Sequence, residues 1–169
     1  MKQITVLIKP ASSLCNMRCA YCFYSDVSAS RENPSFGIMK KETAETIIEH
    51  IFIDLAPGDA ITFAFQGGEP TLAGLDFFKF FTAAVDKRSA GVKVNYALQT
   101  NGLLLNEEFT GFLKDSGFLT GLSLDGPAAL HNQNRADAGG GGTFGKVIRA
   151  KRLLDAIKAP YNVLAALTL

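Results

Sequence analysis

Residues 13–24 read Ser-Leu-Cys-Asn-Met-Arg-Cys-Ala-Tyr-Cys-Phe-Tyr, and they contain all three cysteines of the chain, Cys15, Cys19 and Cys22. This C-x3-C-x2-C spacing brings three thiolates into one small volume and supplies no fourth. A four-iron cluster has four iron corners, so three cysteine ligands leave one iron open to a ligand from outside the protein. An open iron beside a strong reductant is a catalytic arrangement, whereas a cluster with four thiolate ligands mainly carries electrons. The stretch therefore predicts a catalytic iron–sulfur site.

Two other uses of these cysteines fit the sequence less well. A structural zinc site needs four nitrogen or sulfur ligands, and the only histidines are His50, in a helical pattern, and His131, in a distant loop. Three observations argue against disulfide bonds: the number of cysteines is odd, their spacing is tight, and the N-terminus lacks a long apolar export segment. A Cys3His zinc site stays open as the alternative to the cluster.

Composition narrows the class of protein further. The 169 residues are about enough for one domain, residues 1–169, and their 47% hydrophobic and 20% charged content is typical of a soluble α/β protein. A net charge of +1 gives no electrostatic reason to expect nucleic acid. No stretch approaches the roughly 18 apolar residues of a membrane span. Together with unpaired cysteines, these features predict a cytoplasmic protein without nucleic-acid or membrane partners.

Strand and helix signals alternate along the chain. The expected strands are Thr5–Ile8, Ala60–Phe65, Val94–Leu98, Gly121–Leu124 and Asn162–Leu167; the expected helices are Lys41–Leu55, Gly74–Lys87, one capped by Asn106 and ended by Gly117, and one capped by Thr143. Strands joined by helices imply right-handed crossovers and a parallel sheet with helices on its outer face. A full eight-unit barrel needs about 250 residues. We therefore predict an α/β fold, a partial parallel (β/α) barrel truncated after about the fifth strand, and expect the chain to be a fragment of a longer protein.

Polar residues follow each of the first four expected strands. The first strand leads into the cysteine stretch, and the next three lead into residues 66–70 (Gln-Gly-Gly-Glu-Pro), 99–102 (Gln-Thr-Asn-Gly) and 123–126 (Ser-Leu-Asp-Gly). Any one of these segments could be only a tight turn. Ligands of parallel α/β proteins bind at the C-terminal ends of the strands, so four such segments in register predict one shared cavity.

With Tyr21 beside Cys22, the cysteine stretch resembles the radical S-adenosylmethionine (SAM) signature. More narrowly, the chain resembles the anaerobic sulfatase-maturating enzymes over essentially all of its length. The motifs that carry this resemblance are residues 7–13, 22–24, 63–74, 121–127, 131–135 and 142–144. The resemblance implies a radical SAM type of barrel.

The resemblance also implies a set of site residues. Cys15, Cys19 and Cys22 would ligate a 4Fe–4S cluster whose open iron binds SAM. The SAM contacts that it implies are Tyr21, Gly68, Ser123 and Arg135, and the residues that it places near the cofactor or the substrate peptide are Gln66, Tyr24 and Asp125.

Each SAM contact has a physical rationale. The backbone of Gly68 can approach the methionine amino group closely, and Glu69 either accepts a hydrogen bond from that ammonium or stabilises its own turn. Ser123 and Arg135 can hold the carboxylate, the arginine through charge-assisted hydrogen bonds. Tyr21 can stack on the adenine or form a hydrogen bond near it.

By this resemblance, the function is radical oxidation of a Cys or Ser side chain in a sulfatase to Cα-formylglycine, with ferredoxin or flavodoxin as electron donor. The catalytic base and two auxiliary clusters of the family belong to a cysteine-rich C-terminal (SPASM) region that the 169 residues do not contain. Asn132 stands where an Asp is frequent in the family, and we expect His131 to be structural. The alternatives are another SPASM-type maturase that modifies peptides and an inactive cluster-binding fragment.

Overall fold

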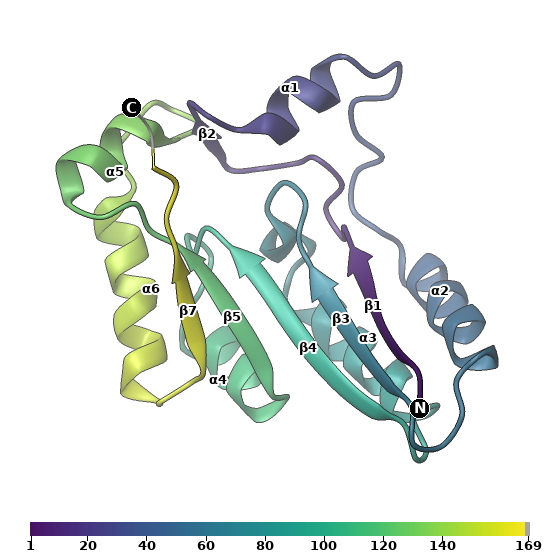
Figure 1. The fold of residues 1–169 in the computed structure, drawn as a ribbon. Helices are drawn as coiled ribbons and strands as arrows, with labels where there is room; N and C mark the ends of the chain where they lie inside the picture. Colours follow the sequence, from purple (N-terminus) through teal and green to yellow (C-terminus); the bar gives the residue numbers. More distant parts are fainter. Residues whose placement is uncertain (168–169) are drawn as a thin grey trace.

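The computed structural model describes residues 1–167, and its main feature is a five-stranded parallel sheet with the order β1-β3-β4-β5-β7 (Figure 1). Its strands are β1 (Gln3–Ile8), β3 (Ala60–Phe65), β4 (Lys93–Thr100), β5 (Phe118–Ser123) and β7 (Tyr161–Leu164). Helices connect successive strands: α2 (Lys41–Ile53), α3 (Leu75–Asp86), α4 (Glu107–Asp115) and α6 (Phe144–Ala156). The predicted α/β fold with a parallel sheet is confirmed.

The core lies between the sheet and these helices. Phe63 and Phe65 on β3, Phe78 and Phe81 on α3 and Phe118 on β5 are each buried to 1% exposure or less. Their rings meet edge to face, with centroids 5.0 Å apart for Phe65 and Phe81 and 5.1 Å apart for Phe65 and Phe78. Such contacts add specific geometry to the large apolar area that each ring buries. They hold β3 against α3 and thereby fix the turn that lies between them at residues 66–69.

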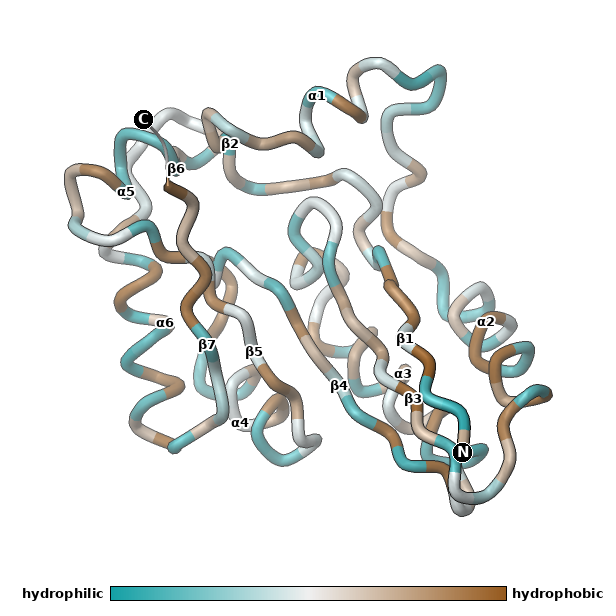
Figure 2. The backbone as a smooth tube through the Cα atoms, in the orientation of Figure 1, coloured by the Kyte–Doolittle hydropathy of each residue, from teal (hydrophilic) through white to brown (hydrophobic). Residues whose placement is uncertain are grey.

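Sequence periodicity accounts for which face of each element is buried. Along α6 hydrophobic and hydrophilic positions alternate at helical spacing (Figure 2), and its inward residues are Val147, Ala150 and Leu154. Along β3 every second residue is buried, which places Phe63 and Phe65 on the helix side. The opposite face of the sheet carries no helix among residues 1–167 (Figure 1). It leaves apolar side chains such as Leu7 and Leu119 exposed, at 57% and 45%.

A smaller layer crosses the C-terminal end of the sheet, and the sequence did not predict it. Its elements are β2 (Met17–Cys19), α1 (Phe23–Ala29), the 3-10 helix η1 (Pro70–Ala73), α5 (Ala128–Asn134) and β6 (Arg135–Asp137). The strands β2 and β6 form a two-stranded antiparallel sheet in which Cys19 is opposite Arg135. Elements of three to seven residues carry too few apolar repeats for their periodicity to be recognised.

Some element boundaries differ from the prediction. The last strand ends at Leu164 and not at Leu167, and β5 begins at Phe118, three residues before the predicted start. Asn106 caps α4 through its side chain, as predicted (2.8 Å to the Phe109 N–H). The hydroxyl of Thr143 does not cap α6, because it donates to the Arg135 carbonyl instead (2.7 Å). Within residues 1–167 no helix has both the length and the apolar character needed to cross a membrane.

Candidate active site

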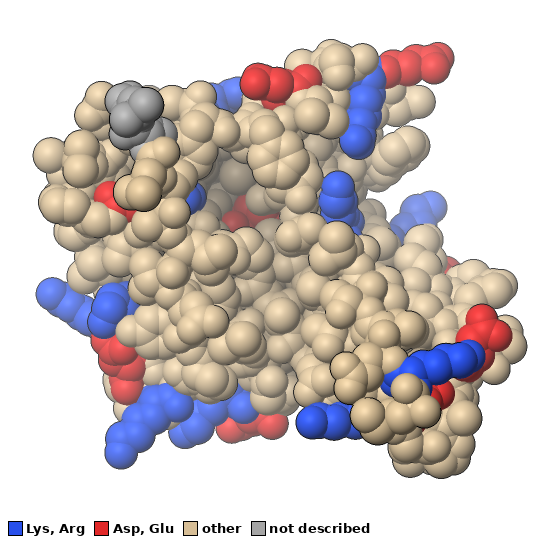
Figure 3. Space-filling model, viewed as in Figure 1, with Lys and Arg blue, Asp and Glu red and all other residues tan. Residues whose placement is uncertain are grey.

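The strand ends and the cysteine stretch enclose one cavity of about 220 Å³. The residues that line it and that the sequence had singled out are Cys15, Cys19, Tyr21, Cys22, Tyr24, Gln66, Gly68, Glu69, Ser123 and Arg135. Asp125 is not among the residues that line it. Figure 3 shows a hollow in the upper part of the molecule, with acidic atoms visible inside it. The structure therefore brings together almost all of the predicted site residues.

Backbone contacts hold the cysteine stretch against the turn after β3. The Gly68 N–H donates to the Ser12 carbonyl (3.0 Å), and the Glu69 N–H donates to the Leu14 carbonyl (2.7 Å). A Cβ atom on Gly68 would lie 2.1 Å from the Leu14 carbonyl oxygen, so no other residue fits without moving one of the two segments. Gly68 thus makes a close backbone approach to the cysteine stretch, a partner that the sequence did not predict; the predicted approach to the methionine amino group of SAM stays a prediction.

The three cysteines are free and belong to different local structures. Cys15 precedes β2, Cys19 ends it, and Cys22 is the N-cap residue of α1. Burial of the thiol raises the pKa of Cys15 from 9.0 to about 11, although the residue as a whole is exposed, and burial also raises the pKa of Cys19. Binding of iron by these thiols would therefore release protons.

The three free thiols that line the cavity are the donors that an iron–sulfur cluster takes from a protein. Among residues 1–167, no three His, Cys, Asp or Glu side chains lie close enough together to hold one metal ion. In the part of the chain that the structure describes, neither His50 nor His131 lines a cavity with the cysteines, so neither completes a Cys3His site. Three free thiols around one cavity fit a four-iron cluster with an open iron.

Glu69 is a buried carboxylate whose hydrogen bonds come from the chain itself. Its Oε1 accepts from the Thr71 N–H (3.0 Å), the Thr71 hydroxyl (2.6 Å) and the Thr100 hydroxyl (2.7 Å). Its Oε2 accepts from the Asn101 N–H (2.7 Å). Burial raises the pKa of Glu69, while these hydrogen bonds act in the opposite direction. Of the two roles expected for Glu69, these contacts favour stabilisation of the turn over binding of an ammonium group.

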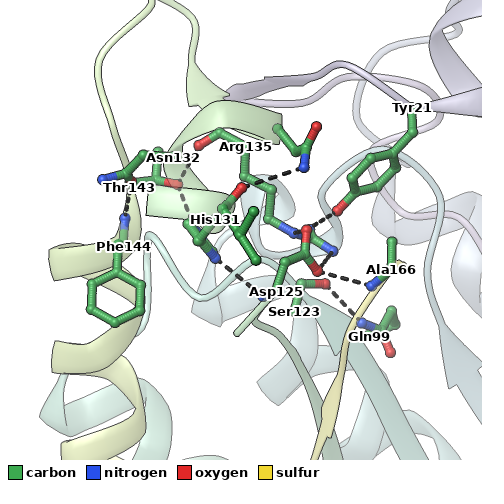
Figure 4. A network of polar contacts seen from close by, with 12 residues as sticks. Tyr21, Gln99, Ser123, Asp125, His131, Asn132, Arg135, Thr143, Phe144 and Ala166 are labelled. Atoms are coloured by element: carbon green, nitrogen blue, oxygen red, sulfur yellow. Dashed lines mark hydrogen bonds and ion pairs between the residues drawn. The ribbon is translucent and has the colours of Figure 1, made fainter. Parts of the chain in front are cut away.

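Asp125 connects four segments around the cavity (Figure 4). Its carboxylate accepts from Arg135 Nε (2.7 Å) and Nη2 (3.1 Å), from the Tyr21 hydroxyl and from the Ala166 N–H (2.9 Å). Arg135 also lies over the Tyr21 ring, 5.4 Å from its centroid. Two residues that were expected to contact SAM are thus held in place by Asp125, which was itself expected near the cofactor or substrate.

The sequence predicted a structural role for His131, but only the structure shows the hydrogen-bond partners of Gln99, Asn132 and His131. Gln99 Nε2 donates to the Ser123 hydroxyl (3.0 Å) and orients that predicted SAM contact. Asn132 Oδ1 accepts from the first N–H of α6, that of Phe144 (2.9 Å), so the helix cap that Thr143 was expected to supply comes from Asn132. His131 is fully buried in α5, not in a loop, and its Nδ1 accepts from the Asp125 N–H (3.3 Å). Polar residues with long-range partners leave no local pattern in the sequence.

The pair formed by Asp125 and Arg135 provides a stability test. Asp125→Asn leaves the buried Arg135 charge without its counter-charge and is expected to lower the free energy of unfolding by about 3–5 kcal/mol, measured by urea titration. The matched control is Glu108→Gln in the exposed pair with Lys79 (2.8 Å), which should cost about 1 kcal/mol or less. Equal losses of unfolding free energy in the two variants would contradict the assignment of Asp125 and Arg135 as a buried ion pair.

The pH dependence of the same variant has a defined sign. Burial alone would raise the pKa of Asp125, but hydrogen bonds from Arg135, Tyr21 and Ala166 outweigh it and lower the pKa below its ordinary value of 3.8. The stabilisation is therefore present above about pH 4 and is lost as the pH falls through the pKa of the folded state. The difference in unfolding free energy between wild type and Asp125→Asn should therefore shrink as the pH falls.

Comparisons with known proteins agree with this geometry. The sequence profile of the radical SAM superfamily matches residues 10–165. The cysteine-type anaerobic sulfatase-maturating enzyme of Clostridium novyi (strain NT) is 46% identical over 165 residues, which cover 97% of this chain and 44% of that enzyme. The serine-type enzyme of Bacteroides thetaiotaomicron is 31% identical over 165 residues, which cover 97% of this chain and 39% of that enzyme.

A solved structure gives the same relationship in three dimensions. Native anSMEcpe with bound AdoMet and Kp18Cys peptide matches with a TM-score of 0.87 at 43% sequence identity, covering 96% of this chain and 43% of that one. The chain spans less than half the length of these relatives. Because the profile, the sequence matches and the fold all agree, the chain belongs to the radical SAM superfamily and, within it, to the family of the anaerobic sulfatase-maturating enzymes.

Proposed function

We propose that residues 1–169 form the cluster-binding and SAM-binding part of an enzyme that oxidises a Cys or Ser side chain of a sulfatase to Cα-formylglycine. The observation that carries this proposal is the cavity that three free cysteines line together with the polar residues at the strand ends. A relative at 43% identity whose solved structure contains AdoMet and a cysteine peptide supports the same function.

Different residues of the chain would bind the iron–sulfur cluster and SAM. Cys15, Cys19 and Cys22 would ligate a 4Fe–4S cluster, and the backbone at Gly68 would bind the methionine amino group. When bound, the cluster and SAM supply a carbon radical that abstracts hydrogen from the substrate. The chain contributes by holding the cofactor in one orientation, because a fixed reacting geometry removes much of the entropy cost of the step.

The contacts within the chain refine the proposed SAM contacts. Arg135 is engaged by Asp125 through Nε and Nη2, so its charge near the cavity is already balanced by a carboxylate. We therefore assign the SAM carboxylate to Ser123 together with the outer edge of the Arg135 guanidinium. Tyr21, whose hydroxyl donates to Asp125, presents its ring to the adenine. Gln66 and Tyr24 lie on the cavity wall and complete the cofactor and substrate surroundings.

The proposed reaction requires a polypeptide substrate and an electron donor. Conversion of Cys to formylglycine removes two electrons and two protons from the side chain. One of each leaves as a hydrogen atom to the SAM-derived radical, and the second electron and proton would pass to the auxiliary clusters and the catalytic base that the family resemblance implies. The sulfur is released as hydrogen sulfide and is replaced by the oxygen of water. The substrate is the sulfatase polypeptide, and reduction of the cluster requires a low-potential donor, for which we propose ferredoxin or flavodoxin. Three free thiols and an oxygen-sensitive cluster suit the reducing cytoplasm.

Anaerobic reconstitution with iron and sulfide tests the proposal directly. After reduction in the presence of SAM, we expect one four-iron cluster per chain and formation of 5′-deoxyadenosine, measured by chromatography. A protein that binds a cluster yet forms no 5′-deoxyadenosine would contradict the claim that the SAM pocket lies within these residues. A protein that binds no cluster would overturn the proposed function altogether.

A further inference from the structure

Asn101 lies between the end of β4 and the cysteine stretch and is 7% exposed. Its Oδ1 accepts from the Leu103 N–H (3.0 Å), which turns its Nδ2 toward the cysteines. Nδ2 donates to Asn16 Oδ1 (2.8 Å) and lies 3.8 Å from Cys15 Sγ. An amide suits this position, because its oxygen accepts one hydrogen bond while its nitrogen donates another.

The position of this amide is set by the turn after β3. The Asn101 N–H donates to Glu69 Oε2 (2.7 Å), and the preceding Thr100 hydroxyl donates to Glu69 Oε1 (2.7 Å). Glu69 is itself buried and tied to Thr71. The buried carboxylate therefore fixes the backbone from which the Asn101 side chain reaches the cysteine stretch.

Two N–H groups point toward Cys15 Sγ. In addition to Asn101 Nδ2, the Met17 N–H donates to Cys15 Sγ (3.4 Å). Hydrogen bonds to the sulfur ligands of a cluster stabilise the additional negative charge of its reduced form and so raise its reduction potential. The nearby Glu69 carboxylate acts in the opposite direction, because its negative charge disfavours further negative charge on Cys15. Asn101 contacts both groups, with its backbone N–H on Glu69 and its side-chain amide at Cys15 Sγ.

We propose that Asn101 is a positioning residue that orients Cys15 and raises the reduction potential of the cluster that Cys15 ligates. The inference rests on the proposed function only in taking Cys15 as a ligand. A higher potential makes the cluster easier for a donor to reduce, and reduction is the step that must precede SAM cleavage.

The test is the midpoint potential of the reconstituted cluster, measured by EPR-monitored redox titration in the absence of SAM. Asn101→Asp keeps the acceptor for Leu103 but replaces the donor with a carboxylate oxygen, and Asn101→Ala removes the donor without adding charge. We expect both variants to have a lower potential than wild type, with the larger shift in Asn101→Asp. The matched control is Asn95→Asp, an exposed position about 20 Å away along the same strand, whose potential should equal that of wild type.

A second measurement decides the question if the Asn101 variants take up no cluster. Pulsed EPR of the reduced cluster in protein labelled with side-chain ¹⁵N-asparagine should show a nitrogen coupling. The coupling should persist in Asn16→Asp, which lacks the neighbouring amide nitrogen but keeps the oxygen that accepts from Asn101. Absence of the coupling in Asn16→Asp, or unchanged potentials in both loaded Asn101 variants, would overturn this inference alone. Absence of a four-iron cluster from wild type would overturn the proposed function and this inference with it.

Discussion

Replacement of Cys19 with alanine is expected to abolish cluster binding. The chain has three cysteines, all of them on the cavity, and no histidine within residues 1–167 lies where it could replace a lost thiolate. With two ligands left, two iron corners would be open and the cluster would not be retained. Iron and sulfide analysis after anaerobic reconstitution should fall from about four irons per chain to background.

The control for this experiment is Ser25→Ala, which removes one side-chain oxygen beside the same loop and leaves all three thiols in place. It should retain the iron content of wild type. A full four-iron signal in Cys19→Ala would remove Cys19 from the ligand set and would favour a different use of the cysteine stretch. The equivalent substitutions of Cys15 and Cys22 extend the test to the whole motif.

Replacement of Gly68 with alanine should separate the two segments that form the cavity. The new Cβ would lie 2.1 Å from the Leu14 carbonyl oxygen and 2.6 Å from the Ser13 carbonyl carbon. These are backbone atoms that cannot rotate away, so the turn and the cysteine stretch would have to move apart. We expect the free energy of unfolding to fall by about 3 kcal/mol, at the upper end of the cost of overpacking, and the affinity for SAM to fall with it.

Gly111→Ala is the matched control for the added methyl group. Gly111 lies in the middle of α4, and a Cβ there would meet nothing within 4 Å. Alanine in a helix interior is favoured over glycine by up to about 1 kcal/mol, so this variant should be slightly more stable than wild type. Opposite signs for the two variants in urea titrations would support the close approach at Gly68. A Gly68→Ala protein with wild-type stability and SAM affinity would contradict it.

Much of the fold was predictable because its signals are local. The helix Lys41–Ile53 and the strand Ala60–Phe65 follow from apolar residues at helical spacing and from a short apolar run ended by a turn. The position of the cavity followed from a general rule, since polar residues after successive parallel strands meet at one edge of the sheet. The layer made by β2, α1, α5 and β6 was missed because its elements are too short to repeat an apolar pattern.

The features of the site likewise include some that the sequence predicted and others that only the structure shows. The sequence by itself determined the grouping of the three cysteines and the alternation that builds a parallel sheet, because each depends on residue type and spacing within a short segment. Only the tertiary structure decided that Asp125 holds Tyr21 and Arg135, that Glu69 stabilises its turn, and that Asn101 reaches Cys15. Hydrogen bonds between residues that are 10 to 104 positions apart form only when packing of the sheet and helices brings their segments together. A buried polar group then forms its hydrogen bond with whichever partner the fold places beside it.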